Sequence, residues 1–194
     1  MEKLIFATNN KNKVAEIRSV LGSEFEIISL KEAEIFIDIP EPHDTLEENA
    51  REKSSFIYAL KNQNCFSEDT GLEVDFLHGF PGVKSARYAG DNASDQENKN
   101  KLLEELQEST NRNAQFKTVI SLQLHGKEYQ FTGVCKGIIT RHEKGENGFG
   151  YDSIFIPEGS NKTFAEMDIE EKNKYSHRKK ATQLLIHFLN QKNG

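Results

Sequence analysis

Residues 4–13 read LIFATNNKNK, in which an apolar run is followed by a run of hydroxyl, amide and lysine side chains. The apolar run predicts a short buried strand, and the polar run predicts a turn. A helix is expected directly afterwards, because Val14, Ile17 and Leu21 recur at helical spacing. Gly22 is expected to end this helix. A strand that leads through a polar turn into a helix indicates an α/β protein.

The rest of the chain continues this alternation of strands and helices. Further strands are expected at residues 25–30, 65–67 and 154–156, and further helices at residues 45–60, from Ser94 and from Ser176. Thr45 and Ser94 each have a glutamate three residues later, which is the capping-box pattern of a helix start. The apolar residues expected to face the core from these helices are Leu46, Ala50, Ile57, Leu60, Leu102, Leu103, Leu106, Ala181, Leu184, Leu185 and Phe188.

The segment from Phe116 to Cys135 has a different period. Apolar residues alternate with polar ones over 116–124 and again over 129–135, and His125-Gly126 interrupts them. This pattern predicts an antiparallel hairpin with one covered face. Together with the strand–helix units, it predicts an α/β fold with a mixed, twisted sheet flanked by helices.

Composition limits the class of protein. The chain has 194 residues, with 25 Lys and Arg against 31 Asp and Glu, which gives a formal net charge of −6. This length, without an evident linker or repeat, predicts a single domain over residues 1–194. No apolar run reaches the ~18 residues of a transmembrane helix, and the first residues lack the apolar region of a signal peptide. Cys65 and Cys135 lack metal-ligand spacing, which predicts a reduced, cytoplasmic protein. Net acidity argues against binding polymeric nucleic acid through bulk charge, and no membrane partner is expected.

The charges at two predicted helix starts conflict with the helix dipole. A helix N-terminus has unpaired N–H groups and a partial positive charge, so acidic side chains are usual there. The last helix instead begins Ser-His-Arg-Lys-Lys at residues 176–180, and Lys11 and Lys13 lie in the turn that directly precedes the first helix. A solvated basic face is one explanation, since each clash costs only ~0.3–1 kcal/mol. Two such starts on one acidic chain favour a polyanionic ligand.

Two carboxylates offer complementary chemistry. Glu68 and Asp69 follow an apolar strand, at the kind of strand end where α/β proteins place ligand-binding groups. Mg²⁺ typically takes one or two carboxylates and completes its shell with substrate phosphates. The alternative is a structural turn at Asp69-Thr70-Gly71. Asp-Thr-Gly also marks aspartic proteases, but these bring two such loops together, and this chain has one copy.

Residues 148–152 read GFGYD, which places an aromatic ring between two glycines and ahead of a carboxylate. Phe149 can stack on a planar base, and Asp152 can accept a hydrogen bond from a ring N–H. A tight turn that holds a core phenylalanine is equally consistent with this motif. The sequence shows no nucleophile triad, Walker loop or zinc-ligand spacing.

Seven motifs occur in a specific order. They are Thr8-Asn9-Asn10 with Lys13 and Glu16, Glu48-Asn49-Ala50 with Lys53, EDTGLEV at 68–74, GVKSARY at 82–88, GFGYD at 148–152, FAEM at 164–167, and KNKYSHR at 172–178. In this order and spacing the chain resembles the inosine triphosphate pyrophosphatase family, the house-cleaning purine nucleoside triphosphate pyrophosphatases. The resemblance covers residues 4–181. One departure is Ser153, where the family usually has proline.

The resemblance implies Mg²⁺-dependent hydrolysis of deaminated purine nucleoside triphosphates (ITP, dITP and XTP). The products would be the nucleoside monophosphate and pyrophosphate, and the reaction would cleanse the nucleotide pool. It also implies an elongated fold with two lobes around a central cleft, and a homodimer.

The resemblance and the chemistry of the residues together assign the candidate roles. The substrate-binding candidates are Thr8, Asn9, Asn10, Lys11, Asn12, Lys13, Lys53, Thr70, Phe149, Gly150, Tyr151, Asp152, Lys172, His177 and Arg178. The metal-binding candidates are Asp69, Glu41 and Glu68, and the catalytic candidates are Asp69 and Lys13. Phe149 would stack on the purine, and Arg178 would donate to its 6-oxo group. Asp69 would hold Mg²⁺ or deprotonate the attacking water, and these two roles compete.

Two other classes of function stay open from the sequence. A nucleotide-binding sensor would keep the cationic loop and Phe149 but would not need Asp69. An acidic interaction module would use the basic helix start to dock a partner, and it would not bind nucleotide.

Overall fold

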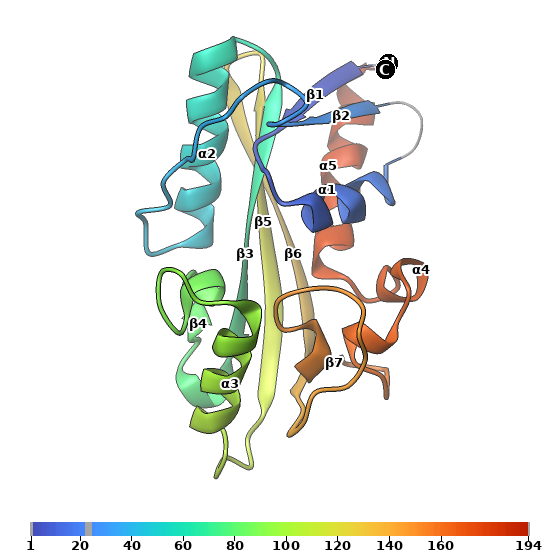
Figure 1. Cartoon of the computed structure of the whole chain (residues 1–194). Coiled ribbons are helices and arrows are strands. Elements are labelled where there is room, and N and C mark those ends of the chain that lie inside the picture. The colour runs from blue at the N-terminus through green and yellow to red at the C-terminus, as the bar shows by residue number, and fades with distance from the viewer. Residues whose placement is uncertain (1, 22–24, 194) are drawn as a thin grey trace. The chain divides into compact units, whose positions relative to one another are not determined.

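The computed structural model describes residues 2–21 and 25–193. Its sheet has the strand order β2-β1-β3-β5-β6-β7, and β4 pairs with β3 (Figure 1). The strands are β1 (Glu2–Phe6), β2 (Phe25–Ser29), β3 (Cys65–Val74), β4 (Pro81–Gly82), β5 (Asn113–Leu124), β6 (Lys127–Ile139) and β7 (Phe155–Pro157). The α-helices are α1 (Lys11–Arg18), α2 (Leu46–Lys61), α3 (Asp95–Glu105), α4 (Ile169–Lys172) and α5 (His177–Asn193). Because β1 pairs in parallel with β2 and β3 while β6 pairs antiparallel with β7, the predicted mixed sheet is confirmed.

The structure divides into two compact units, each assembled from separate segments of the chain. The first unit comprises residues 1–69, 118–133 and 178–194, and the second comprises residues 70–117 and 134–177. In the first unit, α1 and α5 cover one face of the strands and α2 covers the other (Figure 1). Strand alternation explains this arrangement: Phe6 of β1 belongs to the core beneath α1 and α5, whereas its neighbour Ile5 belongs to the core with Ile57 of α2.

The core of the second unit is rich in aromatic rings. The ring centroid of Phe116 lies 4.7 Å from that of Phe155 and 6.1 Å from that of Phe164. Leu102 of α3 and Tyr151 belong to the same cluster. The predicted GFGYD loop is therefore anchored in this core by its own tyrosine.

The predicted hairpin is present, and β5 and β6 form it. His125 and Gly126 connect the strands with φ angles of 50° and 77°, which suits a tight hairpin turn. The prediction of one covered face is wrong for the second half of β5, where residues 118–124 are all buried. The second face is covered by α2: the hydroxyl groups of Ser121 and Ser54 lie 2.8 Å apart, and Gln123 donates to a serine of the same helix.

Strand β3 is longer than predicted. It continues through Glu68, Asp69 and Gly71 to Val74, so these residues lie within a strand rather than in a loop after it. Gly71 allows this, because a Cβ at that position would lie 2.6 Å from the carbonyl oxygen of Gly82 in the paired strand β4. The missing side chain lets the strands approach, and the polar motif is held in regular sheet geometry.

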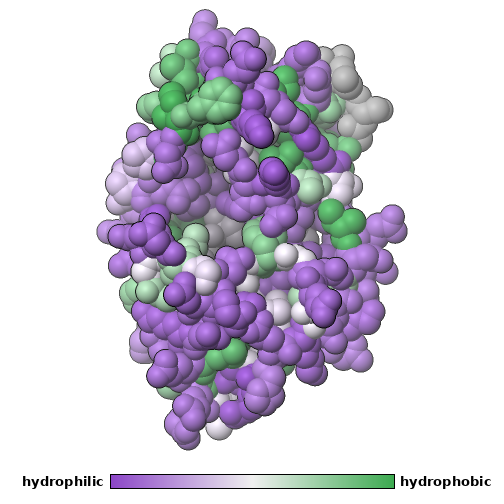
Figure 2. Space-filling view, in the orientation of Figure 1, coloured by the Kyte–Doolittle hydropathy of each residue, from purple (hydrophilic) through white to green (hydrophobic). Residues whose placement is uncertain are grey.

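Smaller differences concern the helix faces and ends. Leu60 and Leu184, which were expected in the core, are each 48 % exposed. The first helix begins at Lys11, inside the predicted polar turn, and ends at Arg18, before Leu21, which was expected to lie in it. Gly22, the residue expected to stop it, lies outside the described residues. Figure 2 shows a mostly hydrophilic surface with an apolar area over α2, where Phe56 and Leu60 are exposed. In the described part of the chain, no helix has both the length and the apolarity needed to span a membrane.

Candidate active site

A buried cluster of four charged side chains lies in the first unit. Arg178, at the start of α5, donates from Nε and Nη2 to the two carboxylate oxygens of Glu68, at 2.7 and 3.0 Å. Its Nη1 donates to Glu16 of α1. Lys13 Nζ lies 3.1 Å from the same Glu68 carboxylate. Two cations and two carboxylates therefore form one network, centred on a side chain with no exposure.

This network accounts for much of the charge conflict seen in the sequence. Burial alone would raise the pKa of Glu68, but Arg178 and Lys13 lower it to about 2. Burial likewise opposes the charge of Arg178, and the two carboxylates outweigh it and raise the pKa of the guanidinium. The cations at the starts of α1 and α5 thus have an anionic partner inside the chain. The presence of Arg178 and Lys13 at helix starts therefore does not by itself require a polyanionic ligand.

A second charged cluster surrounds Lys53 of α2. Its Nζ donates to Glu41, to the backbone oxygen of Glu68 at 2.7 Å and to Asp69 Oδ1 at 3.2 Å. Burial opposes the charge of Lys53, but Asp69 and Glu41 hold its pKa above the usual value. Burial and the nearby Glu41 raise the pKa of Asp69.

The other oxygen of Asp69 is the most distinctive atom of this cluster. Oδ2 is buried, and no donor in the described part of the chain reaches it. A buried carboxylate oxygen without a partner is costly, because it has lost water without gaining a hydrogen bond. Such an atom indicates a group that receives its partner, a metal ion or a proton donor, from outside the chain.

The residues that hold these clusters lie at helix starts. The side chain of Asn10 caps α1 by accepting from the backbone N–H groups of Asn12 and Lys13, at 3.0 and 3.2 Å. Asn49, which is fully buried in α2, donates to and accepts from the backbone of His43. It thereby fixes the segment that follows Glu41. Both asparagines position charged side chains that lie near them in the sequence.

The metal-binding candidates fit Mg²⁺ in part. Asp69 has an unpartnered oxygen, and the side chain of Glu41, 28 % exposed, contacts the same lysine as Asp69. Glu68 fits less well, because both of its oxygens are held by cations. Among residues 2–21 and 25–193, no three His, Cys, Asp or Glu side chains group as a self-contained metal site. This donor set suits an ion that takes one or two carboxylates and otherwise binds phosphate and water.

The second unit holds the aromatic candidates. Asp152 Oδ2 accepts from the backbone N–H of Phe149 at 3.0 Å and from Lys172 Nζ at 2.7 Å. Lys172 Nζ also lies 5.3 Å from the centre of the Phe149 ring, within cation–π range. The contact is close: a Cβ at Gly148 would lie 2.1 Å from Asp152 Oδ2. The carboxylate that was expected to accept from a base ring N–H therefore uses this oxygen to hold the loop.

The remaining candidates of the second unit lie in or beside its core. The hydroxyl group of Tyr151 donates to the carbonyl oxygen of Ser85 at 2.8 Å. His177 is buried, and its ring stacks on Phe116 with an interplanar angle of 14°. Thr70 lies in β3 directly after Asp69. Tyr151 and His177 thus support the unit through packing, whatever further contacts they make.

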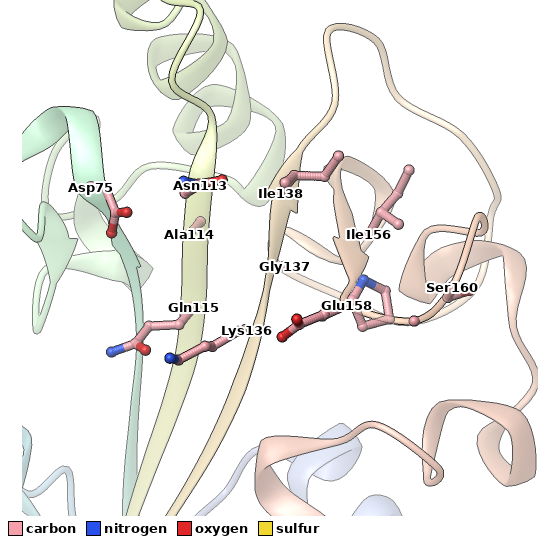
Figure 3. Close-up of a pocket in the computed structure, with 12 residues that line it drawn as sticks. Asp75, Asn113, Ala114, Gln115, Lys136, Gly137, Ile138, Ile156, Glu158 and Ser160 are labelled. Atoms are coloured by element: carbon pink, nitrogen blue, oxygen red, sulfur yellow. The ribbon is translucent and has the colours of Figure 1, made fainter.

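Each unit also has a cavity in its surface away from these charged clusters. The cavity in the first unit has a volume of ≈ 850 Å³ and includes Asn9 and Lys11 in its wall, together with the exposed Phe36. The cavity in the second unit has a volume of ≈ 580 Å³ and is bordered by β5, β6 and β7 (Figure 3). Its polar side chains include Lys136 and Glu158, and it contains none of the candidate residues.

Comparison with known proteins identifies the family. The sequence model of the Ham1 family matches residues 4–188. The chain belongs to the Ham1 family. Relatives named dITP/XTP pyrophosphatase in Flavobacterium johnsoniae and Flavobacterium psychrophilum are 54 % and 51 % identical to it. Each match covers 96 % of this chain, and 97 % and 98 % of the relative, respectively.

Solved Ham1 structures confirm the predicted fold class. The Staphylococcus aureus Ham1 protein matches with a TM-score of 0.89 and 38 % identity, over 98 % of this chain and 100 % of the other. A HAM1 protein from Coxiella burnetii gives the same TM-score at 36 % identity, with the same coverage. The names of the Ham1 relatives agree with the family resemblance found from the sequence motifs.

The sequence motifs missed the connections among these residues. Glu16 was part of a motif, but its contact with Arg178 joins residues 162 positions apart. Asn49 was also in a motif, and only the structure shows that it fixes the segment after Glu41. Asp95 belongs to none of the seven motifs, yet it accepts a hydrogen bond from the backbone N–H of Gly150. The spacing of residues within a motif cannot predict contacts between residues so far apart in the sequence.

Proposed function

We propose that this protein hydrolyses deaminated purine nucleoside triphosphates to the nucleoside monophosphate and pyrophosphate, with Mg²⁺ as the cofactor. The observation that supports the proposal most directly is Asp69. Its buried Oδ2 has no donor among the described residues, while Lys53 holds Oδ1. The names of the Ham1 relatives provide the class of substrate.

The phosphate groups are assigned to the first unit. The Asn10 cap orients the start of α1, where the helix dipole favours an anion. Lys13 is partly exposed, with 18 % of its side chain accessible, so it can exchange part of its contact with Glu68 for a phosphate oxygen. Lys53 is buried and charged, and it neutralises the carboxylates around it.

Asp69 and Glu41 are the residues that would hold the metal. When bound, Mg²⁺ would neutralise charge that develops on the leaving pyrophosphate. Asp69 is also assigned to orient the attacking water and to accept its proton. Burial and Glu41 raise the pKa of Asp69, but a bound cation would oppose this shift, so the metal-binding and proton-accepting roles compete. Lys53, through its bond to Oδ1, fixes the direction in which Oδ2 points.

The base is assigned to the second unit. Phe149, held through its N–H by Asp152, offers a ring face for stacking. Lys172 and His177 are assigned as hydrogen-bond donors to the 6-oxo group of the base. A site that hydrogen-bonds a 6-oxo acceptor can reject a 6-amino group by ~10⁴ or more, because its donors would be left unpaired. Such a site would favour inosine triphosphate over adenosine triphosphate.

The test is incubation of the protein with Mg²⁺ and ITP, with ATP and GTP in parallel, and separation of the products by ion-exchange chromatography. We expect IMP and pyrophosphate from ITP, and little reaction of ATP. GTP shares the 6-oxo group of ITP, so low turnover of GTP would mean that the site also excludes its 2-amino group. Asp69→Asn, purified identically, controls for contaminating enzymes, and excess chelator tests the metal requirement.

Other outcomes separate the alternatives. Formation of IDP and phosphate would mean that a different bond is cleaved. Stabilisation by ITP without turnover would favour the sensor, and absence of nucleotide binding with Mg²⁺ would favour the interaction module. The homodimer implied by the resemblance stays a prediction, which sedimentation velocity checks.

A further inference from the structure

Asp95, the first residue of α3, holds the backbone beside Phe149. Its Oδ2 accepts from the N–H of Gly150 at 2.7 Å. Gly150 has a φ of +60°, and a Cβ placed there would meet no atom within 4 Å, so local packing does not fix this backbone. The position of Asp95 itself is well defined, because Ser94 and Glu97 form a complete capping box at the start of α3.

Glu143 makes a second connection between α3 and the same loop. It accepts from Gln96 Nε2 at 2.5 Å and from Lys99 Nζ, both on α3. It also accepts from the hydroxyl group of Ser153 at 2.8 Å. Lys99 Nζ donates to that hydroxyl oxygen at 3.1 Å, which closes a ring of contacts. The segment 143–153 is thus tied to α3 at its two ends through Glu143 and Ser153, and at Gly150 through Asp95.

We propose that Asp95 and Glu143 are positioning residues for nucleobase binding, because they hold residues 143–153 on α3 in the conformation that presents Phe149. This inference rests on the proposed function, in which Phe149 stacks on the base. Gln96 and Lys99 hold Glu143 directly, whereas Ser153 is tied to α3 through its hydroxyl group, which donates to Glu143 and accepts from Lys99.

The first test compares Asp95→Ala with Asp95→Asn. Alanine removes the acceptor, so the loop spends less time in the binding conformation and KM for ITP rises. We expect a rise of about 3–10-fold, the effect of losing one hydrogen bond to a charged acceptor at the surface. The kcat should stay within about twofold, because stacking is similar in the ground and transition states. Asparagine keeps an oxygen acceptor, so its KM should stay near the wild-type value.

Glu104→Ala is the matched control, since it removes an exposed carboxylate from the same helix. Its KM should equal that of the wild type. The double variant Asp95→Ala with Glu143→Ala should raise KM by more than the product of the single effects, because each connection partly compensates for loss of the other. Thermal melting of every variant checks that the fold is retained.

The second test distinguishes a role of Asp95 in positioning Phe149 from a general loss of order in the protein. In a Phe149→Ala background, Asp95→Ala should change KM by less than about twofold, because the ring through which it acts is already absent. Inhibition by inosine should weaken in Asp95→Ala, while inhibition by pyrophosphate should not change. Equal weakening of both inhibitors, or an unchanged KM in Asp95→Ala, would overturn the inference. Absence of ITP turnover in the wild type would instead overturn the proposed function.

Discussion

The two units hold their candidate residues by different physical means. In the first unit, Glu68 and Arg178 are fully buried, and ion pairs that span distant segments of the chain fix them. In the second unit, Phe149 is only partly buried. Its backbone N–H is held by Asp152, which forms a buried ion pair with Lys172, and single hydrogen bonds to the exposed Asp95 and Glu143 tie its loop to α3. A buried ion pair leaves an uncompensated charge when one partner is lost, whereas a surface hydrogen bond exchanges with water. Loss of Arg178 in the first unit should therefore cost far more stability than loss of Asp95 or Glu143 in the second.

The largest expected effect is at Asp69. Asp69→Asn keeps an oxygen for Lys53 but loses the negative charge and the ability to accept a proton. We expect kcat for ITP to fall by about 10³-fold or more, with nucleotide binding largely retained. Steady-state kinetics and calorimetric titration with IMP measure the two quantities. Asp44→Asn, an exposed aspartate of the same unit, is the control. Wild-type turnover in Asp69→Asn would remove this residue from the mechanism.

Arg178→Ala should mainly affect stability. The substitution leaves Glu68 and Glu16 buried without their shared cation, and breaking such a pair costs about 3–5 kcal/mol. Urea unfolding measures the loss. Arg18→Ala removes an exposed arginine of the same unit and should cost about 1 kcal/mol or less. If the two variants unfold at the same urea concentration, the buried ion pairs of Arg178 do not contribute the expected stability.

Phe149→Ala should have an intermediate effect that is confined to binding. Loss of base stacking costs about 1–3 kcal/mol, or roughly 5–150-fold in KM, with little change in the urea midpoint. Phe149→Tyr keeps the ring face and should keep KM within about threefold. A large loss of stability in Phe149→Ala would instead show that the ring is mainly a core residue, as the tight-turn interpretation holds.

The smallest effect concerns Glu143 and acid stability. Hydrogen bonds from Gln96 and Lys99 lower the pKa of Glu143 from 4.5 to about 2. A carboxyl with a lowered pKa in the folded state stabilises the protein above pH 4.5, and this contribution is lost as the pH falls through about 2. Glu143→Gln should therefore be less stable than the wild type at pH 6, with a smaller difference at pH 2. Urea unfolding at the two pH values measures it. A difference that does not depend on pH would contradict the lowered pKa.

The sequence predicted the parts of this structure that depend on local patterns. The strand–turn–helix of residues 4–18, the two capped helices and the hairpin around His125-Gly126 all follow from spacing, caps and turn residues, and the structure confirms them. The extent of β3 could not be predicted, because it depends on Gly82 approaching Gly71 from another segment. The covered second face of β5 likewise depends on α2, far away in the sequence.

For the candidate site, the residue types were predicted, and several of their contacts were not. Lys13 and Arg178 were identified as cations at helix starts that favour a polyanionic ligand, and that ligand stays a prediction. The anion found in the structure is Glu68 of the same chain. Since Glu68 lies 110 positions from Arg178, no window of sequence could pair them. The connection from Asp95 to Gly150 also involves a backbone N–H, which leaves no trace in residue identity.

The burial of the two thiols has a practical consequence. Cys65 and Cys135 are both buried, and burial raises the pKa of Cys65 to about 12. Thiol-reactive labels attack the thiolate at accessible positions, so the native protein should label slowly at neutral pH. A single cysteine introduced at an exposed position in residues 143–150 would then take up a fluorophore with little labelling of Cys65 and Cys135. The chain is thus already suited to site-specific spectroscopy, without removal of its own cysteines.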